Sequence, residues 1–140
     1  MNKKRGQIAT EYLIIVGFVV FLVISVLGIG LVYSAQAKDR IRFNYLINFG
    51  NKITSSSESV FFSGEPSKVT LVAYLPSGVE GLEISGNELI FDITSMSGRD
   101  RISFSSDVIM QGEISFSEGV KRIIIEAGPF NVTVSEDASQ

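Results

Sequence analysis

Cysteine and histidine are both absent from this chain of 140 residues. Their absence removes disulfide bonds, thiolate nucleophiles, imidazole bases and the commonest zinc ligands at once. It also leaves no cysteine on which a lipid anchor could be attached. Any stability that the protein has outside the cell must therefore come from packing alone.

Recognisable catalytic patterns are missing as well. Serine is plentiful, but it has no histidine to act as a base, and no Ser-x-x-Lys motif occurs. Asp92, Asp100 and Asp107 are expected on separate turns or strand faces, without the spacing of a metal-binding loop. The sequence therefore predicts a protein that is not an enzyme, has no cofactor and presents a solvated acidic surface.

Charge is unevenly distributed along the chain. The net charge is −3, but three of the twelve cations lie together at positions 3–5. Without them, nine cations face fifteen acids, which gives a net charge of −6. Such a chain has no basic footprint for phosphates, so nucleic acid is not an expected partner.

One long apolar run stands out. Residues 12–37 contain no charged side chain, and the 21 residues Leu13–Tyr33 are apolar on all sides. As a helix they would rise roughly 30 Å, which matches the hydrocarbon core of a bilayer. The run therefore predicts a helix that spans a membrane.

Cations on both flanks bear on the orientation of this span. Those at positions 3–5 favour a cytoplasmic N-terminus. Lys38, Arg40 and Arg42 on the other flank oppose that orientation. The polar, serine-rich remainder leads us to expect the N-terminus inside and the following domain outside.

Helical periodicity continues beyond the span. Ile41, Tyr45, Phe49 and Ile53 recur every four residues with polar residues between them, which indicates one apolar face. The sequence predicts a single helix over residues 7–53. We expect it to stop at Gly50-Asn51 and the serine-rich run that follows.

A period of two then takes over. Residues 59–135 contain short alternating apolar and polar runs separated by turns rich in glycine. They predict seven or eight strands in a small antiparallel sheet or sandwich, with the amphipathic half of the helix covering one face. Residues 136–140 form a polar tail. The expected fold class is α+β, with a long N-terminal helix and a β-rich extracellular head.

The segment Lys3-Lys4-Arg5-Gly6-Gln7-Ile8-Ala9-Thr10-Glu11-Tyr12-Leu13 is the most informative one. Glu11 stands at the mouth of the span, where a carboxylate is costly to bury. Basic residues, a glycine and then Gln-x-Ala-x-Glu-Tyr opening an apolar helix resemble the archaeal class III signal peptide of type IV pilin-like proteins. The resemblance covers residues 3–33, and the later strands carry no signature of that family.

This resemblance implies a processing step and a fate for the helix. A prepilin-type aspartyl peptidase would cut between Gly6 and Gln7, removing the leader 1–6 and keeping the helix. Subunits would then leave the bilayer and bundle their helices into a filament, driven by an assembly ATPase and a membrane platform protein. A helix that is apolar all round can exchange lipid for sister helices at little hydrophobic cost.

Three glycines lie in the helix that would form this bundle. Gly17, Gly28 and Gly30 would allow close helix approach or local unwinding. The alternative is the ordinary tolerance of membrane helices for glycine.

Cleavage gives Glu11 a role, because it frees an amine on Gln7 one helical turn away. Pairing of the carboxylate with that amine, in its own chain or a neighbour's, would set the register of assembly. Two alternatives remain open. Glu11 would simply be favoured by the helix dipole at the lipid interface, or cyclisation of Gln7 would remove the amine.

Other readings of the chain remain to be weighed. Ala35-Gln36-Ala37 fits a conventional signal peptidase site, which would release a soluble domain starting at Lys38. The length of the apolar run and Glu11 argue against that cut. The leading prediction is a pilin of an adhesive archaeal surface filament, first in the membrane and then extracellular. A single-pass anchored binding domain and a minor initiating pilin are the alternatives.

Asn131-Val132-Thr133 is the only sequon for N-glycosylation. Strand alternation predicts Phe130, Val132 and Val134 pointing inward, which would leave Asn131 pointing outward as an acceptor. Sequons also arise by chance, so an unmodified Asn131 is the alternative.

Overall fold

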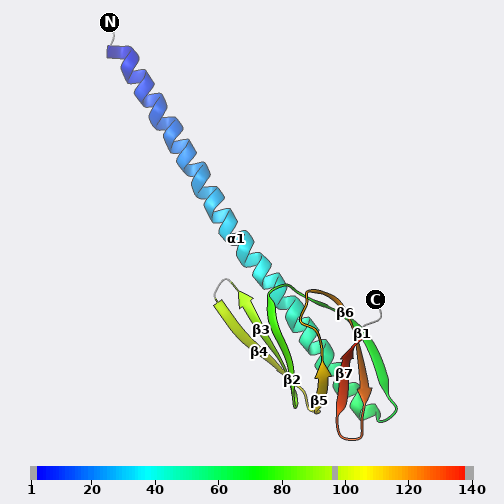
Figure 1. Ribbon diagram of the computed structural model, residues 1–140. Helices are drawn as coiled ribbons and strands as arrows, with labels where there is room; N and C mark the ends of the chain where they lie inside the picture. Colours follow the sequence, from blue (N-terminus) through cyan, green and yellow to red (C-terminus); the bar gives the residue numbers. More distant parts are fainter. Residues whose placement is uncertain (1–2, 96–97, 138–140) are drawn as a thin grey trace. The chain divides into compact units, whose positions relative to one another are not determined.

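The computed structural model describes residues 3–95 and 98–137, with side chains described from residue 8 onward. In these residues one helix is followed by seven strands (Figure 1). Their bounds are α1 Lys3–Ser63, β1 Lys68–Leu75, β2 Val79–Ser85, β3 Glu88–Ser95, β4 Gly98–Ser105, β5 Met110–Glu113, β6 Gly119–Ala127 and β7 Val132–Glu136. The α+β class, with an apolar N-terminal helix and a C-terminal β-rich part, is confirmed.

By its internal contacts the chain divides between Lys38 and Asp39 into two compact units. The described part of the first unit is helical throughout, and we call residues 8–38 the apolar segment. The second unit contains the rest of α1 and all seven strands, and we call its described residues 39–137 the head. The two units are described separately below.

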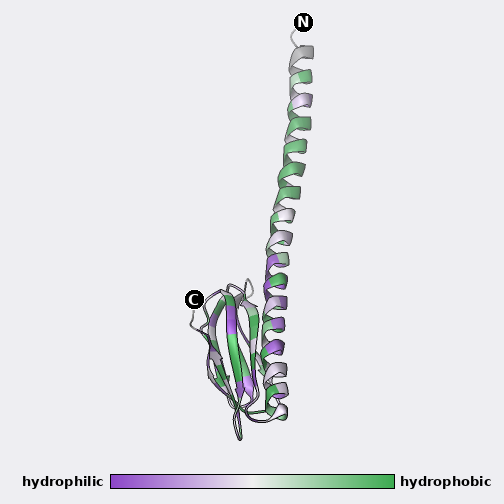
Figure 2. Cartoon of the chain, turned by 90° about the vertical axis from the view of Figure 1, so that its right-hand side faces the viewer, coloured by the Kyte–Doolittle hydropathy of each residue, from purple (hydrophilic) through white to green (hydrophobic). Residues whose placement is uncertain are grey.

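The apolar segment has no core of its own. Each large apolar side chain from Ile8 to Tyr33 is exposed, by 39–73%, and Figure 2 shows this stretch of helix coloured as hydrophobic. Ser25 is a polar residue within it. Its hydroxyl donates a hydrogen bond to the carbonyl of Phe21 at 2.8 Å, so this donor is satisfied within the helix. By length and composition the helix fits a membrane-spanning anchor.

The expected helix end was wrong. Instead of stopping near residue 53, α1 runs to Ser63, and the first strand begins at Lys68 instead of near residue 59. The hydroxyl of Thr54 donates to the Gly50 carbonyl, so this small polar side chain bonds back onto the helix instead of ending it. The stop is Gly64, whose φ of 75° lies in the left-handed region and whose N–H donates to Phe61.

The buried face of the helix also differs from the expected one. Ile41 and Tyr45 are 54% and 47% exposed, whereas the helix residues that enter the core are Leu46, Phe49, Ile53 and Val60. Their spacings of three, four and seven residues keep them on one side of α1. The prediction of one apolar face is therefore correct, but the buried face starts at Leu46 and not at Ile41.

Two sheets make up the rest of the head. One has the strand order β1-β6-β7-β5 and the other the order β2-β3-β4. All neighbouring strands are antiparallel except β5 and β7, which are parallel, so the first sheet is mixed and not antiparallel as expected. Gly112 permits this pair, because its φ is 135° and a side chain there would overlap the carbonyl oxygen of Val134.

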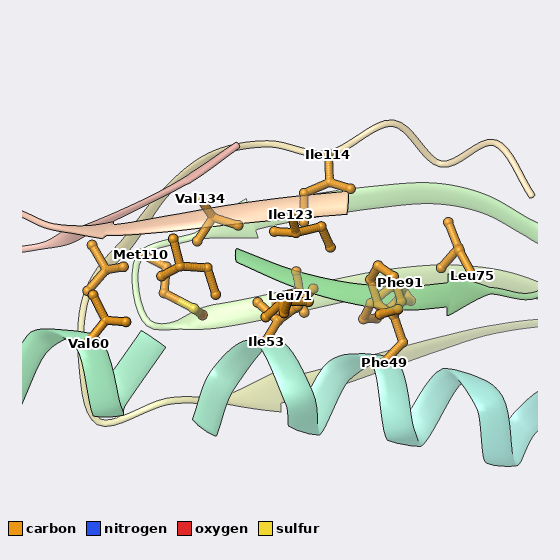
Figure 3. Close-up of a cluster of buried hydrophobic side chains, with 14 of the residues drawn as sticks. Phe49, Ile53, Val60, Leu71, Leu75, Phe91, Met110, Ile114, Ile123 and Val134 are labelled. Carbon is orange, nitrogen blue, oxygen red and sulfur yellow. The ribbon is translucent and has the colours of Figure 1, made fainter. Parts of the chain in front are cut away.

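The core lies where α1 meets both sheets (Figure 3). Phe49 of the helix packs edge-to-face on Phe91 of β3, with ring centres 6.0 Å apart. Phe91 packs in the same way on Phe104 of β4, at 5.7 Å. On the other side, Lys52 donates to the carbonyl of Val72 in β1 at 2.7 Å. The amphipathic part of α1 therefore joins the two sheets.

Candidate functional site

The apolar segment is the largest candidate surface. At Gly17, Gly28 and Gly30 an added Cβ would meet nothing within 4 Å, so all three glycines are open on the helix surface. The helix is continuous through them, without unwinding at any of the three. From residue 13 to residue 33 the surface offers almost only apolar contact, which suits lipid tails or other apolar helices.

Glu11 lies on the exposed surface of this helix. Gly6 and Gln7 belong to the first turns of α1, where only the backbone is described, so their side chains lie outside the described residues. The leader also includes residues 1–2, which lie outside the described residues. The cleavage point and the pairing of Glu11 with a new amine on Gln7 therefore stay predictions.

The sequon lies at the β6–β7 hairpin, but its surroundings differ from the expectation. Phe130 is 84% exposed instead of buried, whereas Val132 and Val134 do point inward. Asn131 is only half-exposed, and its side-chain oxygen lies over Gly128, 2.8 Å from where a Cβ would stand. The turn thus holds the Asn131 side chain against the backbone, because residue 128 has no side chain.

A buried polar cluster in the head was not anticipated from the sequence. Lys121 of β6 is almost fully buried, and its ammonium lies 2.9 Å from a carboxylate oxygen of Glu136 in β7. It also donates to the hydroxyls of Ser115 and Ser117. The other oxygen of Glu136 accepts the backbone N–H of Ser115 at 2.9 Å. Residues 114–117 are a loop that is held by this cluster.

The cluster has clear electrostatics. Burial of the Glu136 carboxylate opposes its ionisation, but hydrogen bonds from Ser115 and Lys121 outweigh that effect and lower the pKa of Glu136. Although Lys121 touches two serine hydroxyls, a serine nucleophile needs a neutral amine as its base. The ion pair of Lys121 with Glu136 instead links β6, β7 and the loop 114–117, so the arrangement suits a structural clasp. In the sequence, only one feature pointed to this cluster. Lys121 lies at an inward-facing position of the alternating strand β6.

The aspartates do not converge on one another. Asp92 accepts two hydrogen bonds from Arg101, at 2.7 and 3.2 Å. Hydrogen bonding to Arg101 lowers the pKa of Asp92. Asp107 lies beyond the end of β4 and donates its backbone N–H to Glu58 at 3.1 Å. Within residues 3–95 and 98–137 no three acidic side chains gather as a metal site would require.

The head also contains one groove of about 630 Å³. It lies between the first turns of α1 within the head and one end of the sheet β2-β3-β4. Its apolar lining includes Leu46, Val79, Ile93 and Ile102. Three arginines join that lining: Arg40, Arg42 and Arg101.

Comparison of the chain with protein-family models, with curated proteins and with solved structures finds no match in any of the three.

Proposed function

We propose that this protein is a structural subunit, similar to a type IV pilin, of an archaeal cell-surface filament with a role in adhesion. It is made as a membrane precursor and becomes extracellular on assembly. The observation that carries the proposal is the apolar segment, whose large apolar side chains from Ile8 to Tyr33 are all exposed. Such a surface needs lipid or sister helices around it.

Both environments are compatible with the same helix. Lipid tails and neighbouring apolar side chains are about equally apolar, so transfer from bilayer to bundle has little hydrophobic cost. The open glycines at positions 17, 28 and 30 let neighbouring helices approach closely. The β-rich head supplies a folded domain that is displayed outside the bundle.

Processing completes the proposal. The motif around Gly6 and Gln7 resembles the site of a prepilin-type aspartyl peptidase, and an assembly ATPase with a membrane platform protein would move the trimmed subunit into the filament. The motif supports this order of events because it places the cut before the apolar segment, which the mature subunit then retains.

The test is the mature N-terminus together with the assembled state. We expect intact-mass measurement of material from the cell surface to give a chain that starts at Gln7, and electron microscopy to show filaments. Deletion of Gly6 is expected to block the cut and abolish filaments while the precursor stays in the membrane. A mature chain that starts at Lys38, or a correctly cut chain that never polymerises, would contradict the proposal.

A second candidate function is a single-pass anchored domain whose head binds a ligand. The groove of the head favours it, since an apolar lining with arginines beside it is a binding feature in its own right. Such an anchor needs no cut, so deletion of Gly6 would leave its activity intact. The same experiment therefore separates the two functions.

A further inference from the structure

The groove lies at one end of the head. Its lining includes the turn from β1 to β2, the last residues of β3 and the first residues of β4. In the strand register Leu75 pairs with Gly119 and Ser95 pairs with Gly98, so these pairs mark that same end. We call the feature the arginine groove.

The opposite end carries a protrusion that the core leaves uncovered. The hairpin from β6 to β7 presents Phe130, which is 84% exposed, and the loop after β4 presents Ile109, which is 50% exposed. The two segments touch, because the N–H of Val132 donates to the carbonyl of Ile109 at 2.8 Å. Asp107 is exposed on the same loop. We call Asp107, Ile109 and Phe130 the distal knob.

Hydrogen bonds to neighbouring segments hold the distal knob in place. The carboxylate of Glu58 on α1 accepts hydrogen bonds from the hydroxyl of Ser106 and the N–H of Asp107, both at 3.1 Å. The hairpin beside it is tied down by the bond from Ala127 N–H to the carbonyl of Ser67, at 2.9 Å. A fixed protrusion loses little conformational entropy when it docks.

Charge and polarity at the two ends are complementary. The arginine groove has three arginines against two aspartates in its lining, whereas the remainder of the head has five cations against twelve acids. Arg42 pairs with Asp39 of the same lining at 3.7 Å, and Arg101 pairs with Asp92 at 2.7 Å. Arg40 therefore gives the groove its excess of positive charge within an acidic domain. The apolar lining can take an aromatic ring, and Arg40 can take a carboxylate. The distal knob offers both, in Phe130 and Asp107.

We infer that the distal knob of one copy docks into the arginine groove of the next, so that heads in the filament join end to end. The inference rests on the filament function proposed above and names the head surfaces that meet. Because the two surfaces differ and lie at opposite ends, each docked copy leaves one of each free. Contacts of this kind propagate as an open chain of subunits instead of closing into a dimer.

The absence of native cysteine permits a direct cross-linking test on the full chain. Ser77→Cys places a thiol on the groove lining, and Pro129→Cys places one beside Phe130. With both substitutions in one chain, mild oxidation of assembled material is expected to give a ladder of trimers and higher species in denaturing gels. Each single variant is expected to give dimers at most.

The matched control pairs Pro129→Cys with Ser103→Cys, which is exposed on β4 outside the groove lining. It is expected to give no ladder. If filaments form but the groove pair gives no more ladder than this control, the docking inference is overturned and the filament function stands. If wild-type chains correctly cut at Gln7 form no filaments, the filament function fails and the inference falls with it.

A second variant removes the aromatic anchor. Phe130→Ser changes a side chain that the core does not use, so the head should keep its stability while the yield of filaments falls at least tenfold. Phe116→Ser is the control, since Phe116 is also exposed, at 54%, but lies outside the knob. Unchanged filament yield from Phe130→Ser, with unchanged thermal stability, would overturn the docking inference.

Discussion

The ammonium group of Lys121 lies 2.9 Å from the carboxylate of Glu136, and this pair ties the last strand of the head to its neighbour and to the loop before it. The side chain of Lys121 is 6% exposed and that of Glu136 is 27% exposed. The same carboxylate accepts the backbone N–H of Ser115. One acidic residue near the C-terminus therefore satisfies a buried charge and fixes a loop.

Loss of this carboxylate should destabilise the head. Glu136→Ala leaves the Lys121 ammonium buried with only serine hydroxyls. Removing one partner of a fully buried pair typically costs about 3–5 kcal/mol. Because Glu136 keeps some contact with solvent, we expect a loss of about 2 kcal/mol in the free energy of unfolding, measured by denaturant titration of the full chain in detergent.

The pair Lys68–Glu126 provides the control. It is as short, at 2.6 Å, but both side chains are about half exposed. We expect Glu126→Ala to cost less than about 1 kcal/mol, as is usual for surface ion pairs. Equal losses for the two variants would show that burial of Lys121 does not matter for stability.

Glu136 should also make stability depend on pH. Its pKa in the folded protein lies below its ordinary value of 4.5. A carboxyl of this kind contributes stability that is fully present above the unfolded pKa and is lost as the pH falls through the folded pKa. We expect Glu136→Gln to be less stable than wild type at pH 7 and the difference between the two melting curves to shrink as the pH falls below 4.5. A constant difference between them over this range would argue against the assignment.

The parts of the fold that could be predicted from sequence are those set by periodicity. The run Leu13–Tyr33 is apolar on every side, so no other element than a long exposed helix fits it. Alternation in the second half predicted strands, and the strand β6 alternates as expected around Ile123 and Ile125. The helix end was missed because Gly50 and Thr54 are ordinary stop signals, and only packing against the sheets keeps them helical.

The candidate surfaces were harder to foresee because they depend on contacts distant in sequence. Lys121 and Glu136 are fifteen residues apart, and only the pairing of β6 with β7 brings them together. Phe130 was expected to point inward by strand alternation, but it lies in the hairpin, two residues before β7 begins at Val132. The arginine groove combines residues from α1 and three strands, so no local sequence pattern predicts it.

Gly50 should be intolerant of a side chain even though it is helical. An added Cβ would lie 2.5 Å from the ring of Phe104. Alanine normally favours a helix over glycine by about 1 kcal/mol, but overpacking a core costs about 1–3 kcal/mol. We therefore expect Gly50→Ala to be destabilising in denaturant titration. Phe104→Leu should relieve the overlap, so the double variant should be more stable than the sum of the two single losses predicts.

Modification of Asn131 can be read from intact mass. The sequon is intact and Thr133 is exposed, but a glycan on Asn131 would stand beside Phe130 of the distal knob and obstruct its docking. We therefore expect the subunits of assembled filaments to have the mass of the bare mature chain. Gly128→Ala should disturb the turn, because the Asn131 side chain occupies the space of its Cβ. Added glycan mass that Asn131→Gln removes would show that the sequon is used and would argue against docking of the distal knob.

Glu11 should matter for assembly and not for cleavage. It lies beyond the expected cut, and the new amine of Gln7 would be one helical turn away. In a dry helix bundle a lone charge costs several kcal/mol, so pairing between carboxylate and amine would reward one axial register of neighbouring subunits. We expect Glu11→Gln and Glu11→Ala to be cut at the normal site, as read by intact mass, yet to form few or no filaments in electron micrographs. Glu11→Asp keeps the charge on a shorter side chain and should retain partial assembly. Normal filaments from Glu11→Ala would remove the carboxylate from the assembly mechanism and leave helix packing alone to set the register.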